Sequence, residues 1–239
     1  MAKIQTVFTR CEKKYIIDEE KMSLLLSKIG YRLSPDKYGK STVCNIYFDT
    51  PDFRIIRHSM EKGVFKEKLR IRSYNCPEAD SMVFVELKKK FKGVVYKRRV
   101  RMKYADAVRY LLKGVRPEGL NEQVLSEIDY FRNFYPSLQP RVSLFYDRLA
   151  FYSKEDKNLR ITFDTNIRYR TKQLDIAKGT EGRVISENGK AVMEIKCMGS
   201  MPRWLTRELS LLEIFPSSFS KYGKAYSIFT GLEKEFQAI

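Results

Sequence analysis

The chain has 239 residues, of which 43% are hydrophobic and 13% aromatic, so it can fold around a sizeable core. This composition excludes a disordered basic tail. Lysine and arginine number 46 against 29 aspartate and glutamate, for a formal net charge of +17, which indicates an anionic partner: nucleic acid, a membrane surface or a small polyanion.

The first half of the chain is predicted to consist mainly of strands. Residues 7–17 are predicted as a strand, and residues 18–30 as a helix with Asp18 as its N-cap. Later runs are rich in β-branched and aromatic residues, and short Gly- or Pro-containing links between them suit antiparallel hairpins. These predicted strands are residues 42–50, 68–74, 82–90 and 94–103.

The second half begins with helices and then returns to strands. Apolar residues at intervals of three and four predict helices, whereas alternation predicts strands. The helices are predicted at residues 105–115, 121–135, 203–215 and 220–237, the strands at 141–153, 159–170 and 191–199, and a loop at 171–190. Because strands and helices rarely alternate one to one, we expect a single α+β domain, residues 1–239, with about eight antiparallel strands.

Cysteine and histidine do not form a recognisable metal or disulfide pattern. There is one histidine, His58, and the four cysteines, Cys11, Cys44, Cys76 and Cys197, include no CxxC pair. Neither a zinc site nor a disulfide framework is expected, and a reducing cytoplasm is the expected location. We expect no signal segment and no membrane span, although a membrane-associated partner could hold the protein at a membrane.

Charged residues two apart recur along most of the predicted strands. Residues two apart in a strand point to the same face, so Arg70 and Arg72 share a face opposite Leu69 and Ile71. The same spacing groups Arg10, Glu12 and Lys14; Glu86 and Lys88; Lys97, Arg99 and Arg101; Tyr146 and Arg148; Arg160, Thr162 and Asp164; and Glu194 and Lys196.

Two interpretations of this pattern differ in the surroundings of the charged face. The ordinary interpretation is an antiparallel sheet whose charged face lies in water. The repeated use of arginine over so many strands favours a closed tunnel with the charges inside. Burying unpaired charge is costly, so such a lining predicts a polyanionic ligand, and the planar donors of arginine suit a chain of phosphates.

Three glutamates, Glu12, Glu86 and Glu194, lie among these basic residues. Salt bridging is the ordinary role for each of them. The alternative is to hold a hard divalent cation, Mg²⁺ or Mn²⁺, which prefers oxygen ligands and bridges phosphates.

Nine short motifs follow one another along residues 8–225: RCEKKY, IYFDT, KLRIRSY, FVELKKK, VYKRR, YDRLAF, LRITFDT, MEIK and FSKY. In this order they resemble the VTC domain, the polyphosphate polymerase branch of the triphosphate tunnel metalloenzymes. The resemblance implies an antiparallel eight-stranded tunnel with flanking helices, the CYTH-like fold. It also implies a nucleoside triphosphate and a divalent metal inside the tunnel, with ATP donating its terminal phosphate to a growing polyphosphate chain.

The resemblance also implies roles for individual residues, carried over by matching motif. The residues implied in catalysis are Arg70, Arg72, Lys88, Lys97, Arg148 and Lys196. Those implied to bind the nucleotide or phosphates are Lys14, Arg99, Tyr146, Arg160, Ser220 and Lys221. Glu194 is the leading implied ligand of Mn²⁺ or Mg²⁺, followed by Glu86 and Glu12.

The chain departs from the wider family in two places. VELK is shorter than the ExExK pattern of the triphosphatases, which favours the polymerase branch. Ser217 and Ser218 stand where some members have a basic residue, which leaves the product-exit end open. A triphosphatase, with water as the nucleophile, and a non-catalytic polyphosphate sensor remain alternatives. A nucleic-acid binder is a further alternative, but no RNP-like motif or basic recognition helix is present, so nucleic acid is not expected.

Overall fold

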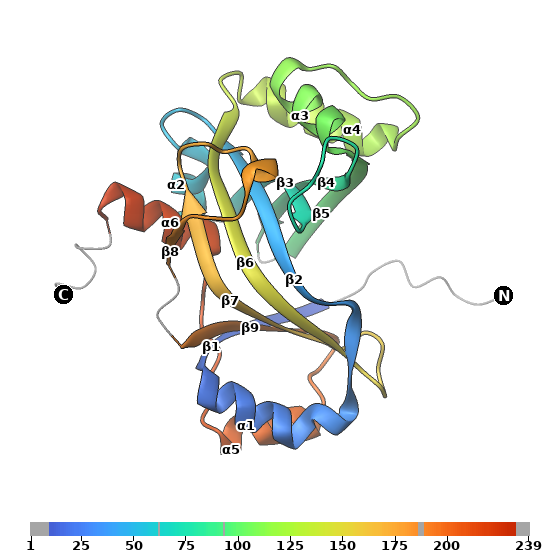
Figure 1. Cartoon of the computed structure of the whole chain (residues 1–239), viewed down its shortest axis with the longest axis vertical. Helices are drawn as coiled ribbons and strands as arrows, with labels where there is room; N and C mark the ends of the chain where they lie inside the picture. The colour runs from blue at the N-terminus through green and yellow to red at the C-terminus, as the bar shows by residue number, and fades with distance from the viewer. Residues whose placement is uncertain (1–9, 62, 93, 186–188, 233–239) are drawn as a thin grey trace. The chain divides into compact units, whose positions relative to one another are not determined.

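The computed structural model describes residues 10–61, 63–92, 94–185 and 189–232, whose helices and strands are labelled in Figure 1. The strands are β1 (Arg10–Asp18), β2 (Leu33–Asp49), β3 (Phe65–Tyr74), β4 (Met82–Phe91), β5 (Val94–Lys103), β6 (Gln139–Ser153), β7 (Arg160–Arg170), β8 (Arg183–Val184) and β9 (Lys190–Met198). The helices are α1 (Glu19–Ile29), α2 (Arg54–Met60), α3 (Tyr104–Lys113), α4 (Glu122–Phe134), α5 (Arg203–Leu211) and α6 (Lys221–Thr230), with short 3-10 turns η1 (Gly30–Arg32) and η2 (Ile176–Lys178).

The α+β class and the antiparallel pairing are confirmed. The hydrogen-bonded strand order is β1-β9-β7-β6-β2-β3-β4-β5, with β8 on β7. The pairs β1–β9, β9–β7, β7–β8, β2–β3, β3–β4 and β4–β5 are antiparallel. Closure of the strands into a tunnel stays a prediction. None of the helices in the described part of the chain is long and apolar enough to cross a membrane.

Several boundaries differ from the prediction. β2 begins at Leu33, whereas the prediction began at residue 42. The sequence concealed the first part of this strand, because Pro35 and Gly39 interrupt the alternation that indicates a strand. α6 ends at Thr230, since Gly231 takes up a left-handed conformation with φ of 78°. The expected strand residues 7–9 and helix residues 233–237 lie outside the described residues.

The helix α2 was not expected from the sequence. It has only seven residues, and Phe53, which precedes it, has φ of 59° and provides no side-chain cap. The carboxylate of Asp49, which precedes the helix by five residues, caps it instead. Its Oδ1 accepts from the Ile55 N–H at 2.9 Å, and its Oδ2 accepts from the Ile56 N–H at 3.0 Å. The helix start therefore depends on a tertiary contact, which local sequence patterns do not report.

The described residues fall into two compact units. The first comprises the described residues within 1–41, 147–166 and 186–219, and the second those within 42–146, 167–185 and 220–239. In the first unit, α1 and α5 cover one face of β1 and β9 (Figure 1). The core there includes Tyr15, Leu25, Ile161, Ile195 and Leu205.

In the second unit, α3 and α4 pack on one face of the β3–β4–β5 ladder (Figure 1). The core on that face includes Leu69, Ile71, Val85, Leu87 and Val100. Residues two apart share a face, so the positions between these core residues in β3, β4 and β5 lie on the opposite face. That opposite face carries the charges that the sequence pattern singled out.

Candidate functional site

The second unit carries a basic face built by strand register. Arg70 of β3 lies opposite Tyr47 of β2 on one side and Glu86 of β4 on the other. Arg72 lies opposite Asn45 and Phe84 in the same way, and Lys88 lies opposite Lys97 of β5. Side chains directly opposite each other on one face of an antiparallel ladder are neighbours. The register therefore gathers cations from β3, β4 and β5.

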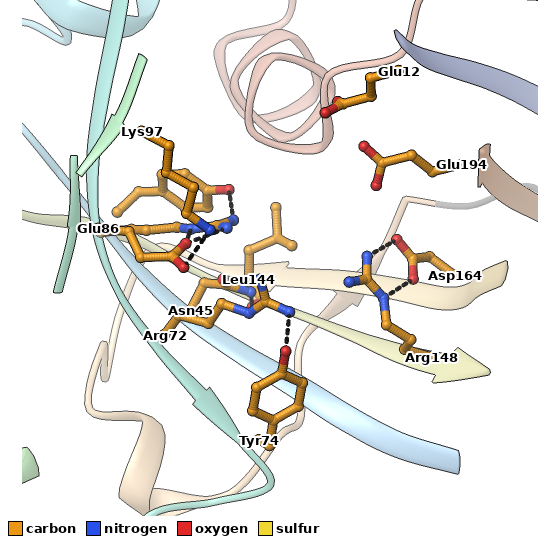
Figure 2. A network of polar contacts seen from close by, with 12 residues as sticks. Glu12, Asn45, Arg72, Tyr74, Glu86, Lys97, Leu144, Arg148, Asp164 and Glu194 are labelled. Carbon is orange, nitrogen blue, oxygen red and sulfur yellow. Dashed lines mark hydrogen bonds and ion pairs between the residues drawn. The ribbon is translucent and has the colours of Figure 1, made fainter. Parts of the chain in front are cut away.

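Glu86 is the negative centre of this face. Its side chain is only 2% exposed. Arg70 donates from Nε and Nη2 to Oε2 at 2.9 and 2.6 Å. The Lys97 ammonium lies 2.6 Å from Oε1, and Figure 2 shows Lys97 extending toward Glu86. Burial alone would raise the pKa of Glu86, but attraction to Arg70 and Lys97 outweighs it and holds the pKa well below its usual range. Glu86 is therefore ionised at neutral pH.

The cations on this face outnumber their carboxylate. Arg72 is buried, yet its Nε has no hydrogen-bond partner among the described residues. Its Nη2 donates to the Tyr74 hydroxyl at 2.8 Å, as Figure 2 shows, and the guanidinium lies 4.8 Å from the centre of the Tyr74 ring. Burial lowers the pKa of Lys97 to about 8, despite the opposing pull of Glu86. A buried donor without a partner beside a destabilised ammonium is an arrangement that an anion would stabilise.

The start of α6 belongs to the same unit. Ser220 caps the helix: its Oγ accepts from the Gly223 N–H at 3.1 Å and from Lys68 Nζ at 2.9 Å. The Lys221 ammonium lies 4.7 Å from the centre of the Tyr146 ring. Ser220 and Lys221, both predicted site residues, thus lie at a helix N-terminus, where backbone N–H groups favour anions.

A tyrosine pair connects this helix start to Arg70. The rings of Tyr47 and Tyr222 stack at 4.5 Å between centroids, and Arg70 Nη1 donates to the Tyr47 hydroxyl at 3.1 Å. The Tyr222 hydroxyl donates to Asp49 Oδ2 at 2.9 Å. Burial raises the pKa of both Asp49 and Tyr222.

The sequence interpretation missed these partners. Tyr47 and Asp49 stand in the IYFDT motif, and Lys68 lies two residues before Arg70 on the same strand face. The motif and the spacing could have identified all three. Tyr222 gave no such indication, because its role depends on where α6 packs.

In the first unit, predicted cations are mostly matched by carboxylates. Arg148 donates from Nε and Nη2 to the two oxygens of Asp164 at 2.6 and 2.8 Å (Figure 2), with side-chain exposures of 7% and 0%. Arg160 Nη2 donates to Asp36 Oδ2 at 2.7 Å. Lys14 Nζ donates to the backbone carbonyl of Phe219 at 2.9 Å. The sequence interpretation did not identify Asp36 as a partner in this set.

Two of the three predicted metal ligands flank a cation. Lys196 Nζ lies 3.6 Å from Glu12 Oε2 and 3.3 Å from Glu194 Oε1, and the two carboxylates lie near one another in Figure 2. Register places them there, since Glu12 is opposite Lys196 and Lys14 is opposite Glu194 in the β1–β9 ladder. The described residues contain no cluster of three or more histidine, cysteine, aspartate or glutamate side chains able to hold a metal ion. Any metal bound here would therefore need further oxygens from a ligand or water.

The predicted site residues thus form two sets, each within one unit. The second unit holds Arg70, Arg72, Glu86, Lys88, Lys97, Arg99, Tyr146, Ser220 and Lys221. The first unit holds Glu12, Lys14, Arg148, Arg160, Glu194 and Lys196. Arg99 lies over the Phe84 ring, 4.5 Å from its centre, and Lys88 is exposed.

Comparisons with known proteins agree with this architecture. A family model of the VTC domain matches residues 9–230. A solved structure of a candidate adenylate cyclase from Bacillus halodurans is 17% identical with a TM-score of 0.52, and the match covers 87% of this chain and 92% of that chain. A candidate adenylyl cyclase from Hippeastrum, described as having a dominant triphosphatase activity, is 14% identical with a TM-score of 0.47, over 92% of this chain and 95% of that chain. The Bacillus halodurans structure supports the fold alone. No protein with a curated description matches the chain.

Proposed function

Because the chain belongs to the VTC-domain family, we propose that it is a polyphosphate polymerase-type phosphotransferase. In this proposal it transfers the γ-phosphate of ATP to the end of a growing polyphosphate chain and releases ADP. The observation that carries it is the basic face of the second unit, where Arg70, Arg72 and Lys97 surround the buried carboxylate of Glu86. A cytoplasmic location is part of the same proposal.

The basic face suits the triphosphate of a nucleotide. Arginine offers planar paired donors to phosphate oxygens, and lysine offers a mobile charge. Within the described part of the chain, the buried Nε of Arg72 has no hydrogen-bond partner, and Lys221 and Ser220 stand at the positive end of α6. We assign phosphate binding to these residues, together with Arg70, Lys88, Lys97, Arg99 and Tyr146.

Glu86 orients the cations in this scheme. It fixes the Arg70 guanidinium by two hydrogen bonds to one oxygen and holds Lys97 at the other. Both of its oxygens are occupied by protein, so we assign it a positioning role ahead of the metal-binding role that the resemblance implied.

Glu12 and Glu194 are the residues we propose to hold Mn²⁺ or Mg²⁺. The fit rests on their present partner: both carboxylates already lie within 3.6 Å of one ammonium, so this pair tolerates a cation between or beside them. When bound, a divalent cation would neutralise charge on phosphate oxygens. We further propose that Lys14, Arg148, Arg160 and Lys196 of the first unit bind phosphate, and that the strands close into the tunnel that the family resemblance implies.

Phosphoryl transfer asks the protein for positioning and charge neutralisation, with little covalent chemistry. A terminal oxygen of the phosphate chain attacks the γ-phosphorus, and the bond from that phosphorus to the β–γ bridging oxygen breaks, leaving ADP. The proposed role of Arg70 and Lys97 is to keep the γ-phosphate in line and to stabilise the charge that develops on the leaving oxygen.

The test is to incubate the purified full chain with ATP and Mn²⁺ or Mg²⁺ and to resolve the products by electrophoresis and phosphate analysis. Long phosphate chains together with ADP support the proposal. Orthophosphate and ADP without chains would replace it by a triphosphatase. Tight triphosphate binding without turnover would indicate a sensor in its place. If single-stranded DNA displaced bound ATP and triphosphate did not, the protein would be a nucleic-acid binder.

A matched pair of variants locates the activity. Lys97→Met removes a cation of the basic face, and we expect a loss of at least tenfold in turnover. Lys113→Met removes an exposed cation at the end of α3 in the same unit and should leave turnover unchanged. Equal loss in both variants would show that net charge, and not the basic face, sustains the activity.

A further inference from the structure

The four cysteines, far apart in sequence, lie as two pairs in space. Cys11 of β1 is directly opposite Cys197 of β9 in the antiparallel ladder of the first unit. Directly opposite residues point to the same face, so this register places the two side chains beside each other. In the second unit, Cys76 lies close enough to Cys44 to raise the pKa of its thiol. All four are free thiols in this structure.

The strand register gives the first pair the geometry of a disulfide. Residues directly opposite in an antiparallel ladder have Cα atoms about 4.5 or about 5.5 Å apart, depending on the hydrogen-bonding position. Disulfides form at Cα separations of roughly 4.4 to 6.8 Å. Either ladder position therefore lies within the range, and a bridge between Cys11 and Cys197 requires no large backbone movement.

The two thiols differ in access. Cys11 is half-buried near the start of β1, whereas Cys197 is 1% exposed and packs in the core of the first unit. A small oxidant in solution can thus reach Cys11 before Cys197. Burial raises the pKa of the Cys197 thiol, the neighbouring Cys11 and Asp156 raise it further, and the positive charge of Lys13 opposes that rise only in part.

We propose that Cys11 and Cys197 form a redox modification site that closes to a reversible disulfide by exchange with a low-molecular-weight disulfide. The Cys11 thiolate attacks the small disulfide and expels one small thiolate, which leaves a mixed disulfide on Cys11. Cys197 then loses its proton to solvent and attacks Cys11 Sγ, which expels the second small thiolate. Two protein thiols and one small disulfide thus become one protein disulfide and two small thiols.

The second pair provides an internal contrast. Cys44 is fully buried, and burial raises the pKa of its thiol to about 12, whereas Cys76 is exposed. Cys44 lies opposite Ser73 in the β2–β3 ladder, so strand register does not align it with Cys76. We therefore expect the Cys11–Cys197 bridge, which register does align, to form first.

The bridge would have a local structural effect. The pair next to it in the ladder is Glu12 opposite Lys196, followed by Lys13 opposite Ile195. A covalent link beside this pair fixes the register of β1 on β9, and with it the position of Glu12 relative to Lys196. The modification does not depend on the proposed function, because it rests on the two thiols alone.

The experiment titrates the full chain with mixtures of reduced and oxidised glutathione, alkylates the remaining thiols, and maps the peptides by mass spectrometry. We expect a peptide that links Cys11 to Cys197, a rise in Tm of ~10 °C, and complete reversal by dithiothreitol. Absence of that linked peptide at every glutathione ratio, or a bridge between Cys44 and Cys76 in its place, would overturn the proposal.

Variants test the order of the two steps. Cys197→Ala should trap glutathione on Cys11, and Cys11→Ala should leave Cys197 unmodified. Cys76→Ser, outside the pair, should retain the bridge. Since Cys197→Ala alters a buried position, the half-buried Cys11→Ala variant gives an independent reading if the first fails to fold. The proposed order would be refuted if two rates were equal. They are the rate at which glutathione modifies Cys197 in the Cys11→Ala variant and the rate at which it modifies Cys11 in the Cys197→Ala variant.

Discussion

Replacing Glu86 by glutamine tests the centre of the basic face. Glu86 is 2% exposed and Arg70 22% exposed, so the pair is mostly buried, and removing its carboxylate costs ~3 kcal/mol, the low end for a buried pair, because the Arg70 charge remains largely uncompensated. The Lys97 side chain is 42% exposed, so its ion pair with Glu86 adds less than ~1 kcal/mol. At roughly 2–4 °C per kcal/mol for a chain of this size, we expect Glu86→Gln to lower Tm by ~6–12 °C at pH 7 in calorimetry.

The matched control is Glu127→Gln, which also breaks an arginine–glutamate pair in the second unit. That pair, with Arg98, has side-chain exposures of 39% and 28%, so its loss should cost ~0.5 kcal/mol. The reasoning would be refuted if both variants lowered Tm equally.

The dependence on pH gives a second check on the same variant. The folded-state pKa of Glu86 is depressed, so its stabilisation is present above the unfolded pKa of about 4.3 and is lost as pH falls below it. The difference between wild type and Glu86→Gln should therefore shrink in acid. A difference that stays constant from pH 7 to pH 3 would contradict this assignment.

Three further predictions concern single contacts. Because burial lowers the pKa of Lys97 to about 8, triphosphate affinity measured by calorimetric titration should fall as pH rises through 8 in wild type, while Lys97→Met should give a flatter profile. Arg148→Met removes the two hydrogen bonds that Arg148 donates to the buried Asp164 carboxylate and should cost ~3 kcal/mol in urea unfolding. A cost under ~1 kcal/mol would show that the structure around Asp164 relaxes. Tyr222→Phe removes the hydroxyl that donates to buried Asp49 and should cost ~1–3 kcal/mol in the same assay, and an unchanged unfolding midpoint would show that this hydrogen bond adds nothing.

Much of the fold follows from local patterns in the sequence. The alternation in KLRIRSY places Leu69 and Ile71 in the core and Arg70 and Arg72 on the other face, as the structure has them. Asp18 caps α1 where the sequence places it, and its carboxylate accepts from the Lys21 N–H at 2.7 Å. Alternation and capping are properties of adjacent residues, so they are visible without tertiary information.

The rest depends on which strands become neighbours. No pattern in the sequence shows that Lys97 reaches the Glu86 carboxylate, or that Tyr222 of α6 stacks on Tyr47 of β2. The cysteine spacing likewise argued against a disulfide framework, although strand register brings Cys11 opposite Cys197. Such contacts join residues far apart in the chain, and only the packed structure specifies them.

Aromatic rings beneath the arginines have one more consequence. Arg99 lies over Phe84 and Arg72 over Tyr74, each guanidinium within 5 Å of the ring centre. A ring attracts a cation by only ~0.5–2 kcal/mol and does not cancel its charge, unlike a carboxylate. An incoming polyanion therefore displaces no counter-charge from either ring. Under the proposed function, a phosphate chain would therefore move from one guanidinium to the next across a shallow energy profile, as repeated addition of single phosphates to a retained chain requires.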